Sequence, residues 1–147
     1  MTEAREGMTE ESLVALNRDL PNKDAVLELL AQMFTDAGRA ADSERILVGL
    51  RAREEEVSTA MGFGFAIPHT KSAAASRASV AYLELNQAIR WSDEQVGQVL
   101  SIIVPEDGAD AHLNILAKLA RKLIDEDFRD RLSSAETSAE VVELLDT

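Results

Sequence analysis

The sequence contains no cysteine, which excludes disulfide bonds, thiolate metal sites and cysteine nucleophiles. Aromatic residues make up only 4% of the chain, so its core must be built mainly from aliphatic side chains, within an apolar content of 46%. The longest apolar run, residues 99–104 with Ser101 inside it, is far shorter than the roughly 20 residues that span a bilayer. The acidic N-terminus has no apolar segment of the secretory kind. We therefore expect a cytoplasmic protein without direct membrane insertion.

Positive charge is also scarce, because 15 Lys and Arg stand against 27 Asp and Glu, which gives a net charge of −12. A surface of this sign repels the phosphate backbone, so the sequence argues against a nucleic-acid partner. A partner with a neutral or basic docking surface is the better expectation. An anionic ligand or phosphoryl group would need a local pocket of positive charge.

The 147 residues suffice for one domain, which buries roughly 70% of the surface that the unfolded chain exposes. Residues 1–11 are polar and aperiodic and are interpreted as a flexible leader, and residues 12–147 as the domain. Strand patterns occur at 13–16, 79–85 and 99–104. Helical patterns follow the capping residues Asn22, Asp42, Asp110 and Thr137, and a shorter one surrounds Phe128 and Leu132.

The interleaving of strands and helices predicts a single α/β domain with a central sheet of about five strands and helices on both faces. The connection around residues 86–98 looks too short and polar for a crossover helix. We therefore expect a mixed sheet and not a purely parallel one.

The chain contains only two histidines, and both adjoin turn residues. His69 follows a loop in which Gly62 and Gly64 alternate with bulky apolar residues, and His112 opens a helix. An isolated histidine is more often structural than functional. A neutral imidazole is nevertheless a competent nucleophile toward phosphorus near pH 7.

Phosphoryl transfer to a histidine requires cations and hydrogen-bond donors around the phosphoryl oxygens. The chain offers an arginine, a second imidazole and a hydroxyl group for this purpose. These are Arg53, His112, and either Ser58 or Thr59. Their spacing alone does not bring them together.

Two segments resemble the enzyme IIA domains of the fructose, mannitol and nitrogen class in the phosphoenolpyruvate-dependent sugar phosphotransferase system. The first contains Arg53-Glu54, Ser58-Thr59, Gly62, Gly64, Ala66-Ile67-Pro68-His69 and Lys71. The second is the helix-opening run from His112 to Arg121. The resemblance covers residues 12–146 and implies that His69 is phosphorylated. It also implies that Arg53 and His112 contact the phosphoryl group or steady the nucleophile, with Arg53 as the phosphoryl-binding cation and His112 as a second imidazole that stabilises or orients. Many relatives have glycine directly after the phosphorylated histidine, whereas this chain has Thr70.

The resemblance also implies the partners. The donor would be the phosphocarrier HPr, and the acceptor a IIB domain, either separate or within a IIABC transporter. No cofactor or metal is expected, because the donor is already a high-energy phosphoramidate and no cluster with metal-ligand spacing is visible. We expect at least one of Met61, Phe63 and Phe65 to form an apolar docking rim beside His69, the alternative being that they fill the core.

Three functions therefore remain open. The preferred one is a fructose-type sugar carrier, the alternative is a regulatory IIA protein of the nitrogen type, and the second alternative is a non-catalytic binding module with structural histidines. Two other features have structural interpretations. Residues 54–56, three glutamates, are interpreted as a solvated helix end, and Trp91 as a packing residue at a strand edge.

Overall fold

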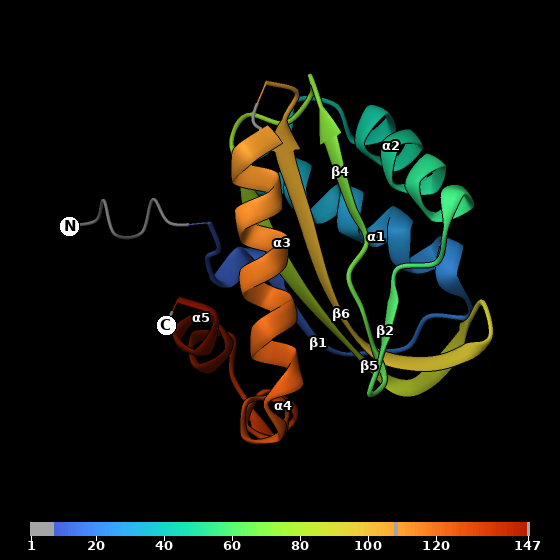
Figure 1. Ribbon diagram of the computed structural model, residues 1–147, viewed down its shortest axis with the longest axis vertical. Coiled ribbons are helices and arrows are strands. Elements are labelled where there is room, and N and C mark those ends of the chain that lie inside the picture. Colours follow the sequence, from blue (N-terminus) through green and yellow to red (C-terminus); the bar gives the residue numbers. More distant parts are fainter. Residues whose placement is uncertain (1–7, 108, 147) are drawn as a thin grey trace.

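The structure, a computed structural model, describes residues 8–107 and 109–146, and of residues 109–113 and 146 the backbone alone. Within these residues a mixed sheet of six strands is combined with α-helices (Figure 1). The elements in chain order are η2 (Glu11–Leu13), β1 (Val14–Arg18), α1 (Lys23–Asp36), α2 (Ser43–Glu56), β2 (Ala60–Gly62), β3 (Phe65–Ala66), β4 (His69–Ser72), β5 (Ser79–Trp91), β6 (Glu94–Pro105), α3 (Ala109–Ile124), α4 (Glu126–Ser134) and α5 (Ser138–Asp146).

The sheet has the order β1-β5-β6-β3-β2, and β4 continues the line of β3 along the same side of β6. The pair β5 and β6 is antiparallel, as is the pair β2 and β3. Strand β1 runs parallel to β5, and both β3 and β4 run parallel to β6. The predicted mixed α/β architecture is confirmed, with six strands where about five were expected.

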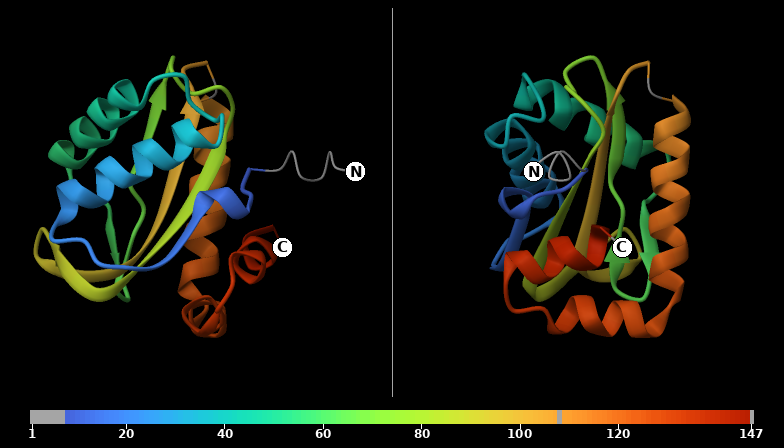
Figure 2. Two further views of the ribbon diagram at one scale, coloured as in Figure 1. Left: turned by 180° about the vertical axis from the view of Figure 1, so that it is seen from behind. Right: turned by 90° about the vertical axis from the view of Figure 1, so that its left-hand side faces the viewer.

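Helices cover both faces of the sheet, as predicted: α1 and α2 lie on one face and α3 on the other, with α4 and α5 continuing from α3 (Figure 2). The alternation of side chains along β5 divides the core accordingly. Ala81 and Leu83 join the apolar cluster under α1 and α2, whereas Val80 and Tyr82 join the cluster under α3, α4 and α5. Among the described residues, the helices are all too short or too polar to cross a bilayer.

Three of the predicted helix starts carry the expected caps. The side chain of Asn22 accepts a hydrogen bond from the N–H of Ala25 at 2.9 Å. The carboxylate of Asp42 accepts two N–H groups from the first turn of α2. The side chains of Thr137 and Glu140 each accept the other residue's N–H, which is the predicted capping box.

The prediction that residues 86–98 form a connection was wrong. The strands β5 and β6 continue through this region as one long hairpin, in which Ile89 pairs with Val96. The apolar side chains of Ile89, Trp91 and Val96 are buried, whereas residues 86–88 are polar or small and exposed. The hairpin turns at Ser92, whose φ of 60° lies in the left-handed region. The exposed residues conceal the strand pattern in the sequence.

The segment before the first strand contacts the rest of the domain. The N–H of Val80 donates to the carbonyl of Met8 at 2.7 Å, and the buried Arg39 lies 3.6 Å from the carboxylate of Glu10. Of the predicted leader, Met8 and Glu10 therefore contact the rest of the domain, Glu11 begins η2, and residues 1–7 lie outside the described residues.

Candidate functional site

His69 is the first residue of β4 and is only 6% exposed. The carbonyl of the preceding Pro68 accepts hydrogen bonds from the N–H of Ile102 at 3.0 Å and from the hydroxyl of Ser101 at 2.9 Å. His69 itself stands opposite Ile102 in the parallel pairing of β4 and β6. The register of this edge of the sheet thus fixes the backbone from which the imidazole projects.

Both ring nitrogens of His69 have hydrogen-bond partners. Nδ1 lies 2.7 Å from the carbonyl oxygen of Ile67, and a carbonyl only accepts, so Nδ1 carries the proton. In the neutral ring Nε2 then holds a lone pair. The Nε–H of Arg53 donates to this nitrogen at 3.2 Å. The structure therefore brings together the two residues that the sequence placed sixteen positions apart, and it directs Nε2 toward a cation.

Arg53 lies in the last turn of α2, and its side chain is 30% exposed. Its Nη1 donates to the carbonyl of Val57 at 3.2 Å and lies 4.0 Å from the carboxylate of Glu56. Among the residues that the structure describes, none accepts a hydrogen bond from Nη2. The guanidinium borders an open pocket between α2 and β4, lined by Gly49, Ala52, Arg53, Glu56, His69, Thr70 and Lys71. An anion in this pocket would meet Arg53.

The pKa of His69 is lowered from its ordinary value, chiefly because burial disfavours the charged ring. The hydrogen bond to the Ile67 carbonyl raises the pKa, the cation of Arg53 lowers it further, and the anion of Glu54 raises it. The net effect is a lowered pKa, with burial as its largest cause. The imidazole is therefore neutral near pH 7, which is the nucleophilic form.

The two candidate hydroxyl groups lie in the segment between α2 and β2. The hydroxyl of Thr59 donates to the carboxylate of Glu54, so its single proton is used there. The hydroxyl oxygen of Ser58 instead accepts the N–H of Ala60 at 3.2 Å. Because Ser58 accepts in this bond, the bond leaves its hydroxyl proton unused.

His112 lies in the first turn of α3, as predicted, but its side chain is outside the described part of the structure. The position of the second imidazole relative to His69 therefore stays a prediction. In the part of the chain that is described, no group of three or more His, Asp or Glu side chains is arranged to hold a metal ion.

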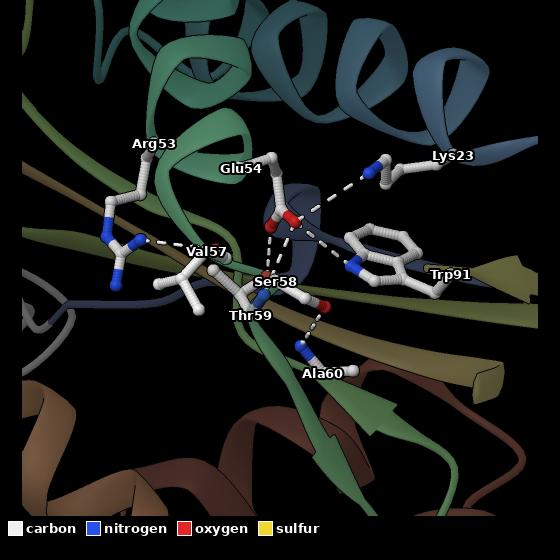
Figure 3. A network of polar contacts seen from close by, with 8 residues as sticks. All are labelled: Lys23, Arg53, Glu54, Val57, Ser58, Thr59, Ala60 and Trp91. Atoms are coloured by element: carbon white, nitrogen blue, oxygen red, sulfur yellow. Dashed lines mark hydrogen bonds and ion pairs between the residues drawn. The ribbon is translucent and has the colours of Figure 1, made fainter. Parts of the chain in front are cut away.

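The interpretation of residues 54–56 as a solvated helix end was wrong for Glu54. This residue is 8% exposed, and its carboxylate accepts hydrogen bonds from Trp91 and Thr59 and lies 4.0 Å from Lys23 (Figure 3). Glu55 and Glu56 are exposed, as interpreted. A signal for the difference existed in the sequence. Ile46 and Leu50 precede Glu54 at intervals of four residues, so all three lie on the buried face of α2.

The three apolar residues of the predicted docking rim differ in their positions. Phe65 is 1% exposed and fills the core under α3, whereas Met61 and Phe63 are 39% and 57% exposed. Phe63 occupies the turn between β2 and β3 with a φ of 61°, and the guanidinium of Arg129 lies 4.0 Å from its ring centroid. Of these three residues, Met61 and Phe63 are therefore the candidates for the docking rim.

Comparison with known proteins gives a consistent result. The family model described as phosphoenolpyruvate-dependent sugar phosphotransferase system, EIIA 2, matches residues 8–147. A PTS system fructose-specific EIIA component from Haloferax volcanii is 35% identical over 136 residues, which are 90% of this chain and 88% of that protein. Multiphosphoryl transfer protein 2 of Escherichia coli is 30% identical over 99% of this chain, which spans 18% of that protein.

Solved structures share the fold. The nitrogen regulatory protein IIA-Ntr from Neisseria meningitidis superposes with a TM-score of 0.87 at 23% identity, over 99% of both chains. The enzyme IIA of mannitol from Escherichia coli, solved in complex with phosphorylated enzyme IIB, superposes with a TM-score of 0.77 at 20% identity, over 91% of this chain and 94% of that one.

Proposed function

The chain belongs to the EIIA 2 family of the phosphoenolpyruvate-dependent sugar phosphotransferase system, whose members are phosphotransferase components, and we propose that His69 is its phosphorylated residue. One observation carries this proposal. Nδ1 of His69 is held by the carbonyl of Ile67, while Nε2 lies 3.2 Å from the guanidinium of Arg53. A lone pair beside a fixed cation at the border of an open pocket suits attack on an anionic phosphorus centre.

In the proposed reaction the donor is phosphorylated HPr. The lone pair of Nε2 attacks phosphorus, the bond between phosphorus and the donor nitrogen breaks, and that nitrogen keeps the electron pair. Arg53 turns from Nε2 to the phosphoryl oxygens, whose charge it neutralises. The positive charge that develops on the ring is stabilised through the Nδ1–H bond to Ile67. Transfer to a IIB domain, separate or within a IIABC transporter, repeats these steps in reverse.

Three further residues have supporting roles in the proposal. His112 opens α3 and supplies a second imidazole that orients or stabilises the phosphoryl group. The hydroxyl of Ser58 is a donor to a phosphoryl oxygen. Thr59, whose hydroxyl proton is bound to Glu54, acts on the site through its backbone.

The proposed final acceptor of the phosphoryl group is a fructose-type sugar, because the relative from Haloferax volcanii carries the name of a fructose-specific EIIA component. Cells that lack the gene should lose phosphoenolpyruvate-dependent phosphorylation of fructose. A protein of the nitrogen-regulatory type would leave fructose phosphorylation intact, so this assay separates the two functions.

The decisive experiment for the carrier is incubation with phosphoenolpyruvate, enzyme I and HPr, followed by measurement of the intact mass. One added phosphoryl group, labile in acid and absent in His69→Ala, supports the proposal. No gain in mass with active HPr would leave the non-catalytic binding module as the explanation.

The role of His112 is tested in the same assay. We expect His112→Ala to accept a phosphoryl group and to transfer it more slowly. Complete loss of acceptance would instead assign the nucleophilic role differently between the two histidines.

A further inference from the structure

Glu54 is a buried carboxylate surrounded by hydrogen-bond donors (Figure 3). Its side chain is 3% exposed. It accepts the indole N–H of Trp91 at 3.2 Å, the backbone N–H of Thr59 at 3.3 Å and the hydroxyl of Thr59, and it lies 4.0 Å from the ammonium of Lys23. A buried carboxylate is costly unless donors satisfy it, and here they come from α1, from β5 and from the segment before β2. Glu54 therefore ties three separate parts of the chain to the end of α2.

One connection runs from Glu54 to Nε2 of His69. Glu54 and Arg53 are neighbours in the last turn of α2, so the rotation and position of this turn are common to both. The hydrogen bonds and the ion pair of the Glu54 carboxylate fix this turn on its buried side. Arg53 projects from the same turn and donates to Nε2 of His69 at 3.2 Å.

A second connection runs from Glu54 to Nδ1 of the same ring. Glu54 accepts two hydrogen bonds from Thr59, one of them from its backbone N–H. The carbonyl of Thr59 accepts the N–H of Ile67 at 3.0 Å. The carbonyl of Ile67 in turn holds Nδ1 of His69 at 2.7 Å.

We propose that Glu54 is a positioning residue for phosphoryl transfer, which holds both ring nitrogens of His69 through Arg53 on one side and through Thr59 and Ile67 on the other. The proposal rests on the proposed phosphorylation of His69. Glu54 does not touch the reacting atoms. It keeps the proton on Nδ1, and it keeps the lone pair of Nε2 directed at the pocket that Arg53 borders.

The substitution Glu54→Gln tests this role. All the groups around the carboxylate are donors, so an amide loses one acceptor oxygen and brings an NH₂ group against them. We expect the peptide at Thr59 to shift and the rate of phosphorylation of His69 by phospho-HPr to fall about 10- to 100-fold, as small misplacements do in oriented reactions. The KM for HPr should stay within about twofold, because exposed docking surfaces are unaltered.

The tautomer of His69 distinguishes a positioning role from a structural one. If Glu54 only stabilised the fold, its replacement would leave this tautomer unchanged. In wild type, ¹⁵N NMR of the imidazole should show the proton on Nδ1 alone, and in Glu54→Gln both tautomers should be populated. Glu55→Gln is the matched control. It removes the same charge from the same turn of the helix at an exposed position, and it should leave both the tautomer and the rate unchanged.

Each outcome has a distinct meaning. A folded Glu54→Gln protein with the wild-type tautomer and rate overturns the proposal, as does a slower reaction that arises from KM alone. If Glu54→Gln does not fold, Thr59→Val removes one bond to Glu54 while preserving shape, and the same two measurements decide. If wild type accepts no phosphoryl group, the proposed function fails, whereas the tautomer comparison still tests the hold of Glu54 on the imidazole.

Discussion

The Nε–H of Arg53 donates to Nε2 of His69 across 3.2 Å, so the cation rests on the atom that we propose as the nucleophile. This contact has two consequences. It lowers the proton affinity of the ring, because a second positive charge beside Arg53 is unfavourable. It also places the guanidinium where the phosphoryl oxygens would arrive, after a small rotation of the side chain.

Replacement of Arg53 is expected to slow phosphorylation of His69 by about 10²- to 10³-fold, the usual effect of removing a donor that stabilises a transition state. Arg53→Lys should be nearly as slow as Arg53→Gln, because an ammonium lacks the planar fork that spans a ring nitrogen and a phosphoryl oxygen. Single-turnover measurement with phospho-HPr gives the rate. Arg51→Gln is the control: Arg51 lies on the same helix in an exposed ion pair with Asp24 at 2.8 Å. An equal loss in this control would contradict the specific role of Arg53.

The phosphorylation rate should be insensitive to pH around neutrality and fall only in acid. The reacting species is the neutral ring, and the pKa of His69 is lowered by burial, so the ring stays neutral until the pH drops below the ordinary histidine value of about 6.5. NMR titration should give the same midpoint as the rate. In Arg53→Gln the midpoint should rise, because a cation that lowers the pKa is lost. A midpoint above 6.5 in wild type would refute the assignment.

The sequence predicted the architecture because its strongest patterns are local. Asn22, Asp42 and Thr137 mark helix starts through hydrogen bonds within one turn, and such signals survive in any tertiary context. The hairpin arms at 86–98 escaped prediction because their strand character comes from pairing across the sheet, as between Ile89 and Val96. Pairing of this kind leaves little trace in the order of residues along either arm.

The site could also be predicted only in part, because motifs are local and contacts between distant residues are not. His69 and Arg53 could be chosen from motifs, but their hydrogen bond depends on how α2 ends beside β4. Glu54 was misjudged because it stands in a run of three glutamates, and charge runs are usually solvated. Its burial depends on Trp91, which lies 37 positions later and reaches it only through the long hairpin.

Phe63→Ala should weaken transfer from HPr without unfolding the protein. The ring is 57% exposed at the tip of the turn between β2 and β3, so its removal costs little packing beyond the contact with Arg129, about 0.5–1 kcal/mol. If the docking rim binds partners, KM for HPr rises several-fold. Phosphorylation by phosphoramidate, which needs no docking, should be unchanged and serves as the control. Unchanged KM for HPr would remove Phe63 from the docking rim.

The close contact between α2 and β4 yields the last prediction, which concerns Thr70, the residue directly after His69. A Cβ at Gly49 would lie 2.5 Å from Oγ1 of Thr70, so Gly49→Ala forces the helix and the strand apart. We expect a loss of about 1–3 kcal/mol in the free energy of unfolding, as overpacking usually causes. The rate of phosphorylation should fall as well, because α2 carries Arg53 toward His69.

In a Thr70→Gly background, the effect of Gly49→Ala on the free energy of unfolding should change sign, from a loss to a gain. The three atoms nearest to a Cβ at Gly49 all belong to the threonine side chain, so Thr70→Gly removes them, and alanine favours a helix over glycine by up to about 1 kcal/mol. Chemical denaturation of the four proteins in this cycle measures the coupling between the two positions. Additive effects would show that Gly49 does not compensate for Thr70. Strong coupling would mean that the chain tolerates a β-branched residue after His69 because the facing helix position has no side chain.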